Sequence, residues 1–89
     1  MSETERLERV KTLLGIPGTY HDAIITGYIA DVMAFMRDSG VPDAAAKSES
    51  AVGAIARGVS DLWNYGAGGA NLSPYFMQRV AQLAAHGEA

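Results

Sequence analysis

The chain has 89 residues, no cysteine, seven basic and ten acidic side chains, and a formal charge of −3. This length predicts one domain, residues 1–89, with a small core, and without disulfides or a zinc-binding set oligomerisation is the remaining way to stabilise it. The mild negative charge argues against a surface that binds phosphates tightly. No stretch approaches the ~18 apolar residues of a membrane helix, and the N-terminal residues MSETERLERV are too polar for a signal peptide.

The first predicted helix spans residues 3–14. Ser2 and Glu5 are spaced as a capping box, in which the hydroxyl and the carboxylate each satisfy a free backbone N–H. Gly15 suits a left-handed cap at the other end, and Pro17 prevents the helix from continuing. The apolar stripe of this helix consists of Leu7, Val10, Leu13 and Leu14.

The second predicted helix, residues 20–39, is apolar on two opposite sides. Thr19 and Asp22 mark its start, and Gly40 with Val41 ends it in a Schellman-type turn. At about 100° per residue, one face carries Ile25, Ile29, Val32 and Met36, and the opposite face carries Ala23, Gly27, Ala30 and Ala34. The polar strips between these faces carry Asp31 and Asp38 on one side and Thr26 and Arg37 on the other. Because so small a chain cannot bury both faces by itself, we expect the Ala–Gly face to contact a neighbouring subunit.

The third predicted helix covers residues 48–66, and either Ser48 or Ser50 fits its N-terminal cap. The segment that leads to these serines is a short connector or a frayed helix start. Gly53 and Gly58 lie inside the helix, where each costs about 1 kcal/mol relative to Ala. They either have no role or mark the close approach of another backbone.

The fourth predicted helix, residues 74–86, has the clearest start in the chain. Ser73 is its N-cap, Pro74 occupies the first helical position, and Leu72 can pack on Met77 as a hydrophobic staple. The predicted buried stripe consists of Phe76, Met77, Val80, Leu83 and Ala84.

The loop GAGGAN between the last two helices could bind a phosphate or serve as a joint. A phosphate-binding loop follows a strand, and the kinase-type loop needs a lysine, but here a helix precedes the loop and no lysine follows it. We therefore interpret Gly66, Gly68 and Gly69 as a hinge loop that lets the last helix swing.

These elements predict an all-α fold, a compact bundle of four helices joined by short loops. Each helix contributes an apolar stripe to a common core, and the second helix has a further apolar face left over. The predicted core anchors are Ile25, Ile29, Val32, Met36, Val59, Leu62, Trp63, Val80 and Leu83.

No arrangement of side chains in the sequence predicts catalysis, a cofactor site or a metal site. His21 beside Asp22 could act as a general base, but no Ser, Cys or second carboxylate is placed to complete a nucleophile relay. Two histidines without a thiolate do not make a zinc site. We therefore expect a protein that is not an enzyme.

A small regulatory helical protein that binds DNA or a partner protein is the alternative function. Short helices fit a helix-turn-helix, whose recognition helix exposes Arg, Lys, Asn or Gln. The polar residues that could serve are Arg57, Asn64, Gln78, Arg79 and Gln82, with Asp61 beside the first two. The densest basic group, Arg6, Arg9 and Lys11, alternates with Glu5 and Glu8. This balance does not favour sequence-specific binding to DNA.

Four stretches in this order carry a resemblance to a known family: LLGIPGTYHDAII, YIADVMAFMRDSGV, AVGAIARGVSDLWNYGAG and NLSPYFMQRVAQLA. Together they resemble the small head–tail connector, or head-completion, proteins of tailed bacteriophages and prophages. The resemblance spans about Leu7 to Ala84. The loop GIPGTYHD has one acid where relatives often have several, and the connector at residues 40–48 is short. The matching positions are Val10, Lys11, Leu14, Ile16, Asp22, Ile25, Ile29, Leu62, Trp63, Tyr65, Leu72, Ser73, Val80 and Leu83.

The resemblance implies a structural role in DNA packaging and virion assembly. It implies a homo-oligomeric ring of roughly a dozen copies, made in the host cytoplasm and placed at the head–tail junction of the virion. The expected partners are further copies of the chain, the portal protein and a tail-side completion protein. Double-stranded DNA would pass through the ring, and an acidic wall would let it slide because grip scales with the phosphates neutralised.

Overall fold

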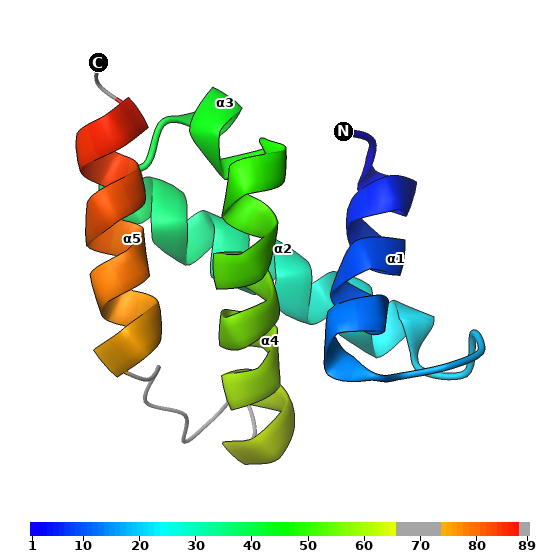
Figure 1. Cartoon of the computed structure of the whole chain (residues 1–89). Helices are drawn as coiled ribbons and strands as arrows, with labels where there is room; N and C mark the ends of the chain where they lie inside the picture. Colours follow the sequence, from blue (N-terminus) through cyan, green and yellow to red (C-terminus); the bar gives the residue numbers. More distant parts are fainter. Residues whose placement is uncertain (66–73, 88–89) are drawn as a thin grey trace.

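Five α-helices and one 3-10 turn make up the part of the chain that the computed structural model describes, residues 1–65 and 74–87 (Figure 1). These described residues contain no strand, so the predicted all-α fold is confirmed. The elements in order are α1 (Glu3–Leu14), α2 (Asp22–Asp38), α3 (Asp43–Ala46), η1 (Glu49–Ala51), α4 (Val52–Tyr65) and α5 (Pro74–Gly87). The sequence predicted either a connector or a frayed helix start before the third predicted helix. In the structure this segment contains the short helix α3 and the turn η1.

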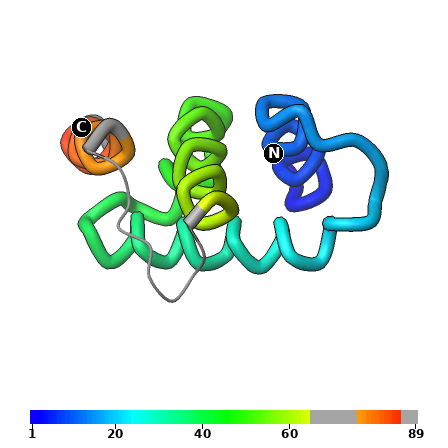
Figure 2. The backbone as a smooth tube through the Cα atoms, turned by 90° about the horizontal axis from the view of Figure 1, so that it is seen from below, coloured from blue at the N-terminus to red at the C-terminus, as the bar shows by residue number. Residues whose placement is uncertain are grey.

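The helices form two layers. Figure 2 shows α5, α4 and α1 side by side in one layer, with α2 running beneath all three. The central helix α4 packs against both α2 and α1, and also against α5. Because α2 is alone in its layer, the chain's own long helices cover only one of its faces.

The ends of α1 are fixed as the sequence predicts. The Ser2 hydroxyl accepts a hydrogen bond from the Glu5 N–H at 3.1 Å, and the Ser2 N–H donates to the Glu5 carboxylate at 3.3 Å, which completes the capping box. At the other end Gly15 adopts φ 71°, and the Ile16 N–H donates to the Lys11 carbonyl at 3.0 Å. This Schellman turn ends the helix.

The same kind of turn ends α2. Gly40 has φ 100°, a left-handed conformation that a side chain would disfavour, and the Val41 N–H donates to the Met36 carbonyl at 3.0 Å. Val41 is buried and belongs to the hydrophobic core. The turn therefore directs the chain back over the core and into α3.

The side-chain cap predicted for the start of α2 is wrong. No side chain caps this helix, and Thr19 contributes only its carbonyl, which accepts from the Asp22 N–H at 3.1 Å. The Asp22 carboxylate instead lies 2.8 Å from the Nζ of Lys11, a lysine that is only 6% exposed and also donates to the Gly18 carbonyl. A hydrogen bond with Asp22 raises the pKa of Lys11 above its ordinary value. An ion pair between α1 and α2 thus replaces the expected cap.

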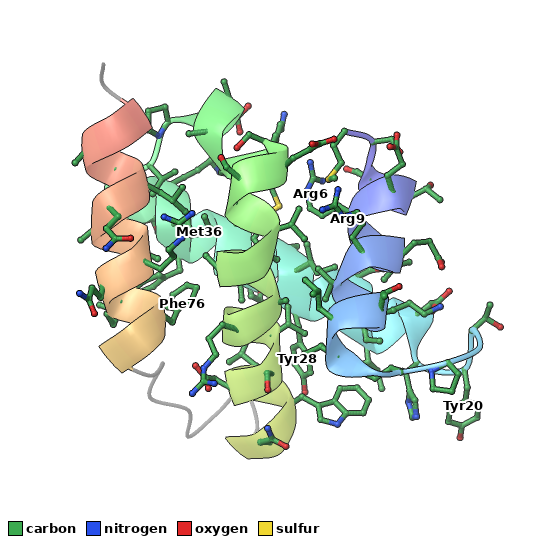
Figure 3. All side chains as sticks on the ribbon, in the orientation of Figure 1. Arg6, Arg9, Tyr20, Tyr28, Met36 and Phe76 are labelled. Atoms are coloured by element: carbon green, nitrogen blue, oxygen red, sulfur yellow. The ribbon has the colours of Figure 1, made fainter. Side chains whose placement is uncertain are left out.

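The core contains most of the predicted anchors. Fully or almost fully buried are Ile25, Ile29, Val32, Met36, Val59, Val80 and Leu83, and Leu62 is partly buried against them. Phe76 of α5 is also completely buried, and its ring lies 5.8 Å from that of Phe35 in α2 (Figure 3). This aromatic contact connects the outermost helix of the upper layer to the helix beneath it.

Three side chains that the sequence places inside lie at the surface. Leu13, expected in the apolar stripe of α1, is 60% exposed, and Trp63 and Met77 are the other two. Trp63 is 37% exposed because it comes near the end of α4, where its ring meets the edges of His21 at 4.9 Å and Tyr28 at 6.4 Å without being enclosed. Met77 is 46% exposed, since its neighbour Phe76 takes the buried position at the start of α5. The expected staple partner Leu72 lies outside the described residues, as does the N-cap Ser73.

At Gly58, helix α4 packs closely on side chains of α2 and α5. A Cβ atom there would lie 2.8 Å from Cε1 of Phe76 and 2.9 Å from both γ-carbons of Val32. A Cβ atom on Gly53 would meet nothing within 4 Å. Gly58 is therefore closely packed, but against side chains and not against the expected backbone, and Gly53 has no close neighbour.

Candidate subunit interface

The surface of α2 that faces away from the upper layer is formed by small residues. Ala23, Gly27, Ala30 and Ala34, here called the α2 stripe, are all exposed in the single chain. A Cβ atom added to Gly27 would meet nothing within 4 Å. The face that the sequence singled out is therefore not covered by α1, α4 or α5, and another molecule can reach it.

The two borders of the α2 stripe differ in charge. On one side lie Asp31 and Asp38, two exposed carboxylates that we call the acidic edge. On the other side lies Arg37, whose side chain is 41% exposed. A helix face with opposite charges on its two borders can select the orientation of whatever packs on it.

The basic side of the stripe opens into hollows between α1 and α2. A smaller one of about 110 Å³ includes Arg6, Thr26 and Ala30 in its wall. A larger one of about 400 Å³, here called the Arg6 hollow, is bounded by Arg6, Ala30, Arg37 and Lys47 together with residues of the first turn of α1. Because Ala30 borders both, the α2 stripe and the hollows form one continuous surface.

Arg6 is the residue that sequence reasoning missed. It is only 4% exposed, although its charge and its alternation with glutamates suggested a solvent-facing side chain. Its guanidinium donates to the Lys47 carbonyl at 3.3 Å, and its Nε has no hydrogen-bond partner (Figure 3). The available signal was position, since Arg6 precedes Val10 by one helical turn and Val10 is fully buried.

Asp43 organises the cations beside the Arg6 hollow. Its carboxylate lies 2.9 Å from the Nζ of Lys47 and 3.4 Å from the Nη1 of Arg37. These contacts, led by the hydrogen bond with Lys47, lower the pKa of Asp43 below its ordinary value. Asp43 therefore ties the end of α2 to α3 and holds both basic side chains next to the hollow.

Aromatic rings surround His21 at one end of the molecule. His21 lies between Tyr20 and Trp63, with ring centroids 4.8 and 4.9 Å away, and Tyr20 points into solvent with 90% of its surface exposed (Figure 3). No nucleophile is hydrogen-bonded to His21 in the part of the chain that is described. Within the same part, no three metal-binding side chains come together, and none of the helices combines the length and apolar character needed to cross a membrane.

Four of the polar residues considered for DNA recognition, Arg57, Asn64, Arg79 and Gln82, are already engaged within the chain. The Arg57 side chain pairs with Asp61 at 3.7 Å, and the Asn64 amide donates to the Ser60 hydroxyl at 3.3 Å. On α5, Arg79 donates to Gln82 at 3.2 Å and to the Ser50 carbonyl at 3.2 Å. A recognition helix would have to break these contacts before it could read bases. The predicted hinge residues Gly66, Gly68 and Gly69 lie outside the described residues.

Comparison with known proteins gives one match that covers almost the whole chain. A family model described as "Phage gp6-like head-tail connector protein" matches residues 4–88. No curated protein and no solved structure matches the chain. The resemblance drawn from the four helical stretches is thereby confirmed.

Proposed function

We propose that this chain, which belongs to the phage gp6-like head-tail connector family, forms a closed ring between the portal and the tail and completes the head after DNA packaging. As a member of that family it is a structural protein of the virion. The ring extends the channel through which the DNA passes, and its other partners are the portal protein and a tail-side completion protein.

The uncovered α2 stripe is the observation that carries this proposal. Small side chains allow a neighbouring helix to approach closely, because the distance between packed helices depends on the side chains at the contact. The stripe lies on the one long helix that is alone in its layer, so packing against it requires no change in the chain's own core (Figure 2). A head-to-tail contact of this kind closes into a ring when its rotation fits a whole number of copies.

The charge of the chain supports a channel through which DNA moves freely. The seven basic side chains are outnumbered by ten acidic ones, which does not favour a surface that neutralises phosphates, and binding strength depends on how many phosphates are neutralised. A ring wall of this composition would guide the duplex without retaining it. The proposed work of the protein is thus assembly and passage, with no bond made or broken.

Leucine substitutions in the α2 stripe test the proposal. Gly27→Leu or Ala30→Leu adds a bulky side chain where a neighbour must approach, and we expect at least about a tenfold loss of assembly on portal complexes. Both positions are exposed, so circular dichroism should show unchanged helix content. Light scattering and electron microscopy of the mixtures report whether annular particles form.

A matched control introduces the same leucine side chain at an exposed position outside the α2 stripe. Ala81 is an exposed position of α5, and Ala81→Leu should assemble as the wild type does. If the stripe variants form annular particles on portal complexes at wild-type concentrations, the α2 stripe is not the contact between copies.

A further inference from the structure

We propose that the Arg6 hollow receives a carboxylate side chain from the acidic edge, Asp31 and Asp38, of the neighbouring copy. This inference rests on the ring proposed above and adds to it a charged anchor with a defined direction. The hollow adjoins the α2 stripe through Ala30, so a copy packed on the stripe would bring its own polar edge over the hollow.

The state of Arg6 is the first observation behind this site. The whole residue is only 4% exposed in the single chain, and no ion pair to it occurs among the described residues. Its Nε has no hydrogen-bond partner, and a backbone carbonyl accepts its one described hydrogen bond. Buried charges are normally paired, and the planar fork of arginine matches a carboxylate in particular.

The surroundings of the hollow also attract an anion. Arg37 and Lys47 line it together with Arg6, whereas Glu3 is its one acidic lining residue. Asp43 offsets part of the charge on Arg37 and Lys47, but the described structure gives it no contact with Arg6. A volume of about 400 Å³ leaves ample room for an aspartate side chain.

The acidic edge supplies the complementary group. Asp31 and Asp38 are exposed, and neither side chain has an ion pair or hydrogen bond with another described residue. They lie seven positions apart, about two helical turns, and therefore point from the same edge of α2. An acidic edge and a basic hollow on opposite sides of one stripe fit a head-to-tail contact, in which each copy presents one surface and receives the other.

Neutralising the acidic edge tests the proposal without touching the core. We expect Asp31→Asn/Asp38→Asn to weaken assembly on portal complexes about tenfold or more, because the partner's guanidinium loses its acceptor. Glu8→Gln/Glu49→Gln removes two exposed charges away from this edge and should assemble as the wild type does. Sedimentation velocity and electron microscopy measure both variants.

Charge exchange tests the pairing more sharply. Arg37→Glu alone and Asp38→Lys alone should each reduce assembly, while the two together should recover a substantial part of it, because the hollow and the edge have then exchanged signs. Arg6→Met should also reduce assembly, with thermal melting checking that the variant folds. If Arg6→Met does not fold, the acidic-edge and exchange variants still decide the question.

The outcomes separate this inference from the ring itself. If the wild type forms rings and the acidic-edge variants assemble equally well, the inference is wrong and the proposed ring is unaffected. If the wild-type protein formed no annular particles on portal complexes, both the ring and this inference would be contradicted. Normal assembly of the acidic-edge variants, with loss of duplex DNA binding in Arg37→Glu, would assign the hollow to phosphates and also overturn the inference.

Discussion

Replacing Gly58 by Ala adds one methyl group where α4 packs closely on side chains of α2 and α5. The new Cβ atom would lie 2.8 Å from Cε1 of Phe76 and 2.9 Å from both γ-carbons of Val32. The side chain of Val32 cannot easily rotate away, because a valine in a helix has one strongly preferred rotamer, and Phe76 is completely buried. At least one helix must therefore shift to make room.

The two effects on the free energy of unfolding can be compared. Overpacking of this severity costs about 2–3 kcal/mol, while alanine gains about 1 kcal/mol over glycine inside a helix. The net loss is about 1–2 kcal/mol, which for a chain of this size lowers the melting temperature by about 5–15 °C. Thermal denaturation of the unassembled protein, followed by circular dichroism, measures the change.

Gly53→Ala in the same helix is the control. The added methyl group meets nothing within 4 Å, so the helix-propensity gain remains alone and the melting temperature should rise by about 4–8 °C. A Gly58→Ala protein that melts at or above the wild-type temperature would refute the close packing of α4 between Val32 and Phe76.

Two further predictions concern α1. Asp22→Asn removes the closer anionic partner of the buried Lys11 and leaves Glu8 at 3.6 Å, so it should lower the melting temperature more than Asp38→Asn, which removes an exposed carboxylate. Because the pKa of Lys11 is raised in the folded chain, its stabilising contribution is complete below the ordinary value of 10.5 and is lost as the pH rises through the higher folded value. Urea titrations in that alkaline range should show a decline in wild-type stability that is weaker in Asp22→Asn, and an equal decline would argue against the pair. Ser2→Ala removes the capping hydroxyl and should cost about 1 kcal/mol of unfolding free energy, and an unchanged urea midpoint would contradict it.

The elements that the sequence predicted well are those whose signals are local. The capping box at Ser2 and the glycine turns at Gly15 and Gly40 fix helix ends through bonds that span only a few residues, so spacing alone was enough. The two faces of α2 followed from helical periodicity in the same way, and the structure leaves Gly27 exposed while it buries Ile25.

The features that the sequence did not predict depend on contacts between distant elements. Lys11 and Asp22 pair across a loop, which displaced the expected cap at Thr19. Arg6 is buried because α1 packs with that side inward, whereas its charge alone would predict an exposed side chain. Trp63 lies at the rim because α4 ends there, and no periodic pattern states where a helix ends relative to its neighbours.

The position of α2 beneath the three other long helices makes it a common support for the domain (Figure 2). It packs against α1 and α4, and through Phe35 it meets Phe76 of α5. A neighbour bound to the outer side of α2 would brace the whole subunit through this one helix. In a ring of the proposed kind, strain between neighbouring subunits would then be shared among all the long helices of each subunit.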